Sequence, residues 1–493
     1  MSTLKKKKIM LEFILNLLVI TLIIIIFTDE SRIKFLQNFS LLVSGIIFLC
    51  SLYLLCEFDT NYANFQGFFS SYFYFKLWSI TYIFAVDGLS IFLIILSTFL
   101  IFVCILYSLN ENLLKYYLLN LFFIELLLIL VFSVLDLLLF YIFFEAILMP
   151  MFLIICVWGS RARKIRAAYL FFFYTLTGSL LLLLGIIYIY FLTGTFNFEY
   201  LSLYIFTFEQ QYWLWLAFFF SFAAKVPLFP FHIWLPEAHV EAPTIGSVLL
   251  AGILLKLGIY GFLRFSILFF PDACIYFSPF INTLAIFGII YASLAAIRQT
   301  DIKRIIAYSS VAHMNLIILG IFSFTSYGLS GALLQTLSHG FVAGALFFLI
   351  GILYSRYYSR LLFYYGGIVM VMPLYSSIFL IFTMANIALP GTSSFCGEFL
   401  ILLGVFLDNF FIAIIASTGV ILCGSYSLWL YNRLIFGNFK KNYSNNFFDL
   451  KMRELIILLP FILFVIIFGI YPEMFFDYTE STILILFFNN LLA

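Results

Sequence analysis

Long apolar segments separated by short polar ones account for almost the whole chain. A helix needs about 20 apolar residues to cross a hydrocarbon core about 30 Å thick, and segments of this length recur. From their lengths and the polar breaks between them we predict about fourteen transmembrane helices. The predicted spans are 9–27, 39–56, 89–107, 118–135, 137–158, 167–192, 213–234, 244–268, 276–296, 305–324, 330–354, 372–404, 410–436 and 455–471. A last apolar piece, 483–488, is too short to cross alone.

The distribution of charge between the loops supports this count. Loops after odd-numbered spans carry most of the basic residues, and loops after even-numbered spans are mainly acidic. Because positive loops collect on one side of a membrane, both termini are predicted on the side poor in positive charge. The N-terminal run Lys5 to Lys8 and the acidic loop after the seventh span do not fit this pattern.

Ionisable residues and helix breaks recur with a period of five spans. The fifth span carries Glu145, prolines break the seventh just after Lys225, and the eighth carries Lys256. Five spans later the tenth carries His313, and a Pro-Gly pair breaks the twelfth before Glu398. Because five is an odd number, a second copy must insert upside down, as in the inverted repeats of many transporters.

The predicted fold class is therefore an all-α membrane protein, with about fourteen transmembrane helices and two inverted five-helix repeats that contain broken helices. Residues 1–493 form one transmembrane domain, in which 116–268 is the first inverted repeat and 274–437 the second. Composition agrees, since 65% of residues are hydrophobic, 10% are charged and the mean hydropathy is +1.16. A net charge of +2 spread over loops does not imply a nucleic-acid partner.

No motif for a metal, a redox cofactor or covalent catalysis is recognisable. The seven cysteines are scattered without a C-x-x-C or Cys/His pairing, so we predict core residues and not metal or cluster ligands. Phosphate loops, dinucleotide fingerprints and nucleophile elbows are also lacking. The basic N-terminus resembles the start of a signal peptide, but no small-residue cleavage site follows, which favours a retained first span.

The ionisable residues inside predicted spans are the candidate functional residues, because burying a charge in lipid is costly. Glu145 lies mid-span, and Lys225 precedes a proline that frees helix carbonyls for water or protein. Lys256 lies among glycines that allow helices to approach closely. The alternatives are a structural ion pair for Glu145 and a lysine that reaches the interface for Lys225.

Histidines supply the second set of candidates, since an unperturbed pKa of about 6.5 suits proton transfer near neutral pH. All four lie near the breaks, and a simple hydrogen-bonded role remains open for each; they are His232, His239, His313 and His339. Glu398 is the carboxylate expected in the second half, and Glu125 is a further mid-span acid. The group Asp301, Lys303 and Arg304 is predicted to be a solvated turn.

Several motifs resemble those of the antiporter-like subunits of respiratory complex I, over most of the chain between about residues 89 and 437. These motifs are Phe143-Phe144-Glu145-Ala146 with Met149-Pro150, Ala224-Lys225-Val226-Pro227, His232-Ile233-Trp234-Leu235-Pro236-Glu237-Ala238-His239-Val240-Glu241-Ala242-Pro243-Thr244, Leu254-Leu255-Lys256-Leu257-Gly258, Ile306-Ala307-Tyr308-Ser309-Ser310-Val311-Ala312-His313-Met314 and Leu389-Pro390-Gly391-Thr392-Ser393-Ser394-Phe395-Cys396-Gly397-Glu398.

The resemblance implies a fourteen-helix proton-translocating subunit in the membrane arm of the complex in the mitochondrial inner membrane. By motif, Glu145 and Lys225 would form an acid–base pair, Lys256 and His313 a central relay, and Glu398 the exit carboxylate. Glu125, His232, His239 and His339 are further possible relay members. The resemblance also implies neighbouring antiporter-like subunits and membrane lipid as partners, with flavin, iron–sulfur clusters and ubiquinone held by partner subunits and none by this chain.

Two alternatives stay open. A subunit of a multi-subunit Na⁺/H⁺ antiporter shares these motifs and would transport sodium independently of NADH. A passive scaffold would use the same charges as structural ion pairs, so their loss would impair assembly and not pumping. Quinone binding is a weaker option, because aromatic residues pack in cores and against lipid.

Overall fold

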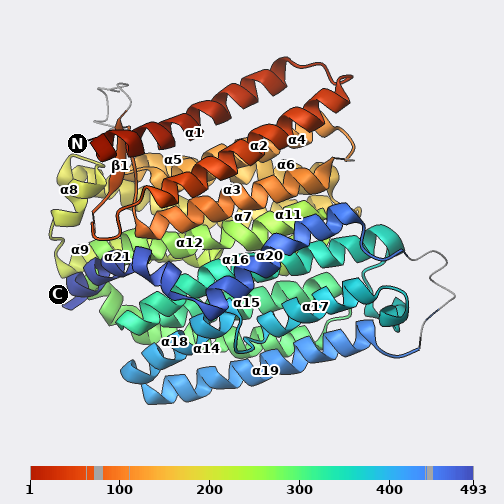
Figure 1. Cartoon of the computed structure of the whole chain (residues 1–493). Coiled ribbons are helices and arrows are strands. Elements are labelled where there is room, and N and C mark those ends of the chain that lie inside the picture. The colour runs from red at the N-terminus through yellow and green to blue at the C-terminus, as the bar shows by residue number, and fades with distance from the viewer. Residues whose placement is uncertain are drawn as a thin grey trace.

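The computed structural model describes residues 2–62, 64–70, 82–109, 111–438, 440 and 448–491, without the side chains of residues 2–9, 70 and 486–491. The side chains of the basic run Lys5 to Lys8 lie outside this described part. The helices run roughly side by side in one elongated bundle, with both ends of the chain at the same end of it (Figure 1).

Twelve helical segments of the described chain are long and apolar enough to cross a membrane. They are α1 (Ser2–Phe27), α2 (Ile33–Cys56), α3 (Gly88–Ser108), α4 (Leu114–Ser133), the pair α5 (Leu137–Ala146) and α6 (Leu148–Trp158), α7 (Lys164–Thr193), the continuous run α11 (Thr244–Leu249), η1 (Leu250–Leu254), α12 (Leu255–Gly261), η2 (Phe262–Ser266) and α13 (Ile267–Phe269), then α14 (Pro271–Arg298), α15 (Ile302–Ile321), α16 (Ser326–Tyr357), α19 (Phe410–Ile435) and α20 (Met452–Ile470). Each coincides with a predicted span, which confirms the prediction of an all-α membrane protein.

Two interrupted segments occupy the remaining predicted spans, the seventh and the twelfth. The first consists of α9 (Phe208–Lys225) and α10 (Trp234–Glu241), and the second of α17 (Pro373–Asn386) and α18 (Ser393–Asp408). Proline accounts for the first break, because it lacks the N–H that would continue the helix beyond Lys225. The total of fourteen spans stays a prediction.

Short elements complete the described chain. They are α8 (Phe198–Leu203), the antiparallel strands β1 (Gln66–Ser70) and β2 (Ile83–Val86), the 3₁₀ turns η3 (Leu362–Tyr364) and η4 (Ile368–Met370), and α21 (Glu473–Leu491). Helix α21 was not predicted at this length, since only its apolar part, 483–488, was recognised; it packs against α3, α13 and α16.

Helix α16 forms the centre of the bundle. It contacts α15, α17 and α18 on one side and α3, α11 and α20 on others, so it joins the earlier and later parts of the chain. Its apolar stretch is completely buried within the protein. Polar side chains on this helix are therefore shielded from lipid by protein on every side, which is the condition under which they are tolerated at membrane depth.

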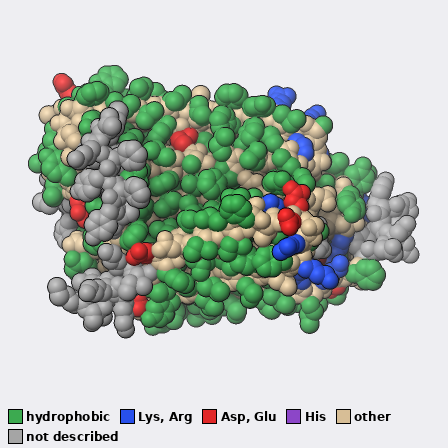
Figure 2. All heavy atoms as spheres, turned by 90° about the horizontal axis from the view of Figure 1, so that it is seen from above, with side chains coloured by type: hydrophobic (Ala, Val, Ile, Leu, Met, Phe, Trp, Pro, Cys, Tyr) green, Lys and Arg blue, Asp and Glu red, His purple; other side chains and the backbone are tan. Residues whose placement is uncertain are grey.

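The outer surface separates into an apolar belt and a charged end. Figure 2 shows hydrophobic side chains covering most of the length of the bundle, with lysines and arginines gathered towards one end. The loops at that end include those after α6, α14 and α16, which agrees with the predicted split of basic residues. The chain ends lie at the opposite end of the bundle (Figure 1).

Candidate functional site

Lys225 is the last residue of α9 and points at a weakened part of the neighbouring span. Its ammonium donates a hydrogen bond to the carbonyl of Phe144 at 2.8 Å and lies 3.0 Å from the centre of the Phe144 ring. The neighbouring span is interrupted at Ile147, where two backbone hydrogen bonds are stretched to 3.4 Å. Pro150 contributes to this interruption, because it cannot donate to the carbonyl four residues earlier.

Glu145 completes this arrangement. Its Oε1 lies 3.5 Å from the Lys225 Nζ, and only 6% of the lysine side chain and 17% of the glutamate side chain are exposed. The pair therefore joins the fifth and seventh predicted spans at a place where both depart from regular helix. We call Glu145 and Lys225 the acid–lysine pair.

Lys256 lies between two π-helical turns, η1 and η2, in a segment that is entirely buried. Its Nζ contacts the carbonyl of Ala251 at 2.5 Å and the Nδ1 of His339 at 2.8 Å. A side chain at Gly340 would lie 3.2 Å from the Gly252 carbonyl, so the glycine allows α16 to come close to η1. Short π-helical turns inside α-helices occur frequently at functional sites.

His339 lies next to a second histidine, His313, which is paired with the acid Glu398. The ring centres of His339 and His313 are 5.8 Å apart, and the Nδ1 of His313 lies 3.0 Å from the Glu398 Oε1. The same carboxylate oxygen accepts a hydrogen bond from the Gln335 amide at 3.0 Å. Lys256, His339, His313 and Glu398 thus form a buried row across α12, α16, α15 and α18, which we call the central file.

Sequence reasoning placed five residues at the site, and the structure brings all of them into these two groups. His339, predicted only as a possible relay member, lies within the central file. Among the described residues, no hydrogen bond or ion pair joins the acid–lysine pair directly to the central file.

The other possible relay members lie apart from both groups. Glu125 is fully buried on α4, and neither of its oxygens has a hydrogen-bond partner in the described chain. His232 lies in the break after α9, where its ring packs edge-on against Tyr291. His239, on α10, stacks at 4.7 Å on the ring of Phe347, and its ring nitrogens have no described partner.

Sequence reasoning missed the polar residues that surround His313 and Glu398. Asn386, at the end of α17, faces the His313 Nε2 at 3.2 Å, and Cys423 on α19 lies 3.8 Å from the same nitrogen. Gln335 could have been found, because it lies four residues before His339 and so shares its helix face. Asn386 and Cys423 come from other spans, and nothing local in the sequence indicates their approach.

The prediction of a solvated turn around Lys303 is wrong. Lys303 is 1% exposed and donates hydrogen bonds to the Ala242 carbonyl at 2.9 Å and to the Ser247 hydroxyl at 3.2 Å. Arg360, in the loop after α16, is also buried and donates to the Val240 carbonyl. Burial lowers the pKa of the Arg360 guanidinium. Both cations are buried because they satisfy carbonyls at the end of α10 that helix geometry leaves open.

Within the described part of the chain, no group of three histidine, cysteine or acidic side chains could hold a metal ion. A row of buried acid, lysine and histidine groups that begins between two π turns and ends beside a helix break is suited to another task, the stepwise movement of a cation or proton. Together with the multi-span bundle, it defines the class of ion-translocating membrane proteins.

The chain belongs to the NADH:quinone oxidoreductase/Mrp antiporter transmembrane family, which matches residues 134–423. It is 52% identical over 464 residues to NADH-ubiquinone oxidoreductase chain 4 of Marchantia polymorpha, covering 94% of this chain and 93% of the relative. The protein of the same name from Arabidopsis thaliana is 52% identical with the same coverage. Among solved structures, a chain of respiratory complex I from Thermus thermophilus with bound NADH matches with a TM-score of 0.87 and 29% identity, over 98% of this chain and 99% of that one.

Proposed function

We propose that this chain is the subunit 4 type of proton-translocating membrane-arm subunit of NADH:ubiquinone oxidoreductase, in the mitochondrial inner membrane. Two findings support this: its relatives carry that name at 52% identity over 94% of the chain, and a buried row of titratable side chains lies within its bundle. Its partners are neighbouring antiporter-like subunits and lipid. Flavin, iron–sulfur clusters and ubiquinone belong to partner subunits, whose redox reaction supplies the energy.

The observation that carries the proposal is the central file. A neutral His339 accepts the proton of Lys256 at Nδ1 across 2.8 Å. His313 stands next to His339 and is itself paired with Glu398 at 3.0 Å. Each member can both take up and release a proton, and protein shields each from lipid. No hydrogen bond joins His339 to His313 in the described chain, where their ring centres are 5.8 Å apart, so transfer between them requires a ring to rotate or a water to bridge them.

The acid–lysine pair acts as the gate before this file. While Glu145 is near, its carboxylate stabilises the Lys225 ammonium; when the carboxylate withdraws, the ammonium loses that stabilisation and its proton is released inward towards Lys256. The two breaks at α9/α10 and α17/α18 support two inverted repeats, 116–268 and 274–437. In this scheme the first repeat takes the proton up and the second, through Glu398, releases it.

The test uses the purified complex in liposomes, with NADH oxidation and internal acidification measured together. Lys225→Met removes the proton carrier but keeps an unbranched apolar side chain, so NADH-driven acidification per assembled complex is expected to be lost. Full acidification by the Lys225→Met complex would contradict the proposal. A scaffold role predicts less assembled complex but normal acidification from each complex that remains.

The Na⁺/H⁺ antiporter is the second candidate, because the matching family includes antiporters of that kind. It predicts sodium flux in liposomes under an imposed pH gradient, without NADH. The subunit proposal predicts that the chain purifies with flavin and iron–sulfur proteins and that acidification stops when NADH is withheld.

A further inference from the structure

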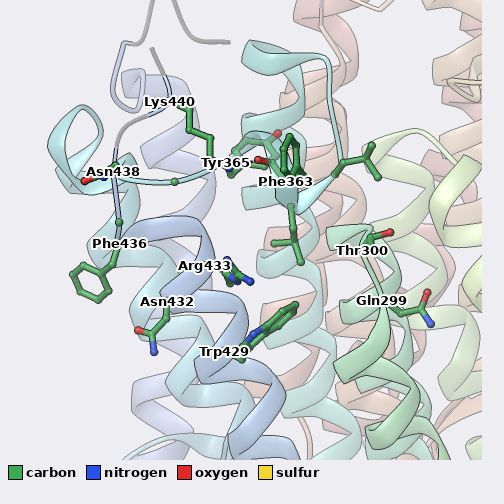
Figure 3. A pocket seen from close by; sticks show the side chains of 14 residues that line it. Gln299, Thr300, Phe363, Tyr365, Trp429, Asn432, Arg433, Phe436, Asn438 and Lys440 are labelled. Atoms are coloured by element: carbon green, nitrogen blue, oxygen red, sulfur yellow. Dashed lines mark hydrogen bonds between the residues drawn. The ribbon is translucent and has the colours of Figure 1, made fainter. Parts of the chain in front are cut away.

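A cavity of about 1000 Å³ opens at the basic end of the bundle, away from the central file. Its walls come from the last turns of α19, the segment 361–366 and the end of α14. Figure 3 shows Trp429 and Arg433 extending from α19, with Phe363 and Tyr365 across from them and Thr300 at the end of α14. None of the proposed proton-transfer residues lines this cavity.

The described lining of this cavity carries positive charge. Arg433 and Lys440 contribute the cations, and no aspartate or glutamate is among the lining residues that the structure describes. Arg433 is exposed, lies 5.9 Å from the Trp429 ring, and forms no ion pair or hydrogen bond with a residue that the structure describes. Lys440 lies over the Phe363 ring at 4.7 Å and donates to the Phe363 carbonyl. A planar guanidinium with open donors suits a phosphate group.

An apolar strip leads away from the cavity along α19. Ile414, Ile421 and Leu428 are spaced seven residues apart, which places them on one face of the helix, and Asn432 continues that face into the cavity wall. All three apolar side chains are exposed, Ile421 by 74%. The helix thus presents an apolar strip at membrane depth and a cationic, aromatic hollow where the strip ends.

We propose that this cavity binds the headgroup of an anionic phospholipid, whose acyl chains lie along the α19 strip. Arg433 binds the phosphate, Lys440 adds a second positive charge, and Trp429 lies at the level of the interface, where tryptophan is favoured in membrane proteins. The basic side of a membrane protein is also where pockets between helices take up anionic lipid headgroups. A free phosphate would use the cations but not the apolar strip.

The test is photolabelling of the assembled complex in liposomes that contain a trace of photoactivatable phosphatidylglycerol or, separately, phosphatidylcholine. Labelled peptides are identified by mass spectrometry. Labelling of 429–440 or 361–366 is expected to be about fivefold stronger with phosphatidylglycerol than with phosphatidylcholine. Arg433→Gln is expected to lower the labelling by phosphatidylglycerol about fivefold, because one basic residue near the membrane surface contributes about that factor to the binding of an anionic lipid. Arg433→Lys should keep most of the preference.

Arg163→Gln is the matched control, because Arg163 is an exposed arginine at the start of α7 and does not line the cavity. Its labelling should equal that of the unchanged protein. Equal labelling by the two lipids, or no effect of Arg433→Gln, overturns the proposal. Loss of labelling in millimolar phosphate would assign the site to free phosphate. No labelling at all would show that a neighbouring subunit covers the cavity. Either result overturns the proposal of a lipid site. If Arg433→Gln does not assemble, Lys440→Gln takes its place.

Discussion

Replacing Glu145 by glutamine tests how strongly the carboxylate holds the Lys225 ammonium. The two charged atoms are 3.5 Å apart, and at an effective dielectric constant of about 20 their attraction is about 5 kcal/mol. Because 17% of the glutamate side chain is exposed, we take about 3 kcal/mol, the low end of the cost of removing one partner of a buried pair. Since about 1.4 kcal/mol is a factor of ten, the ammonium becomes about 100-fold less favoured.

The expected result for Glu145→Gln is a fall of more than tenfold in NADH-driven acidification, with a normal amount of assembled complex. The assay is quenching of a pH-sensitive dye inside liposomes, together with NADH oxidation and the yield of the complex. Glu125→Gln is the matched control, because Glu125 is a buried carboxylate outside both groups, and its acidification should stay within about twofold of normal. If Glu145→Gln retains half of the acidification, or if Glu125→Gln lowers acidification equally, the claim that the Glu145 carboxylate acts through its position beside Lys225 is refuted.

Three further outcomes are expected. Arg264→Gln leaves the buried Asp87 carboxylate without the guanidinium that lies 2.7 Å from it. The complex should therefore lose about 3–5 kcal/mol of stability, measured as a lower melting temperature, and the added substitution Asp87→Asn should restore part of this loss. Gly258→Val should abolish acidification without loss of NADH binding, because its Cβ would lie 2.5 Å from a Val226 methyl and push α12 away from the break. Lys303→Met should cost about 1–3 kcal/mol, measured by the same melting experiment, since the Ala242 carbonyl loses its donor.

The spans and the charged site residues could be predicted because their signals are strong and local. An apolar run of membrane length is itself the physical requirement for a helix in lipid, and a lysine such as Lys256 within such a run is too costly to be incidental. The pairing of Lys225 with Glu145, by contrast, is implied only by the resemblance of their motifs to a known family; in the structure the two charged groups lie 3.5 Å apart. The contacts from Lys256 to His339 and from His313 to Glu398 do not follow the order of these residues along the chain, so this pairing could not be predicted from the motifs.

What the sequence could not reveal depends on contacts between distant segments. Lys303 reads as part of a polar turn, because its neighbours are charged, yet the end of α10 buries it 61 residues away in the chain. Asn386 and Cys423 reach His313 from two other helices. The length of α21 could not be predicted because acidic and hydroxyl residues interrupt its first half, so a continuous apolar run begins only at Ile483.

The contact between Lys256 and His339 has a consequence for how charge is carried. At 2.8 Å one nitrogen must donate and the other accept, so the two groups share a single proton and cannot both be cationic without strong repulsion. When the pair carries a proton, a hop from lysine to histidine therefore moves one elementary charge from α12 to α16 and creates none. Because a second proton would make both groups cationic, the pair must pass its proton on before it accepts the next, so protons travel through this contact one at a time.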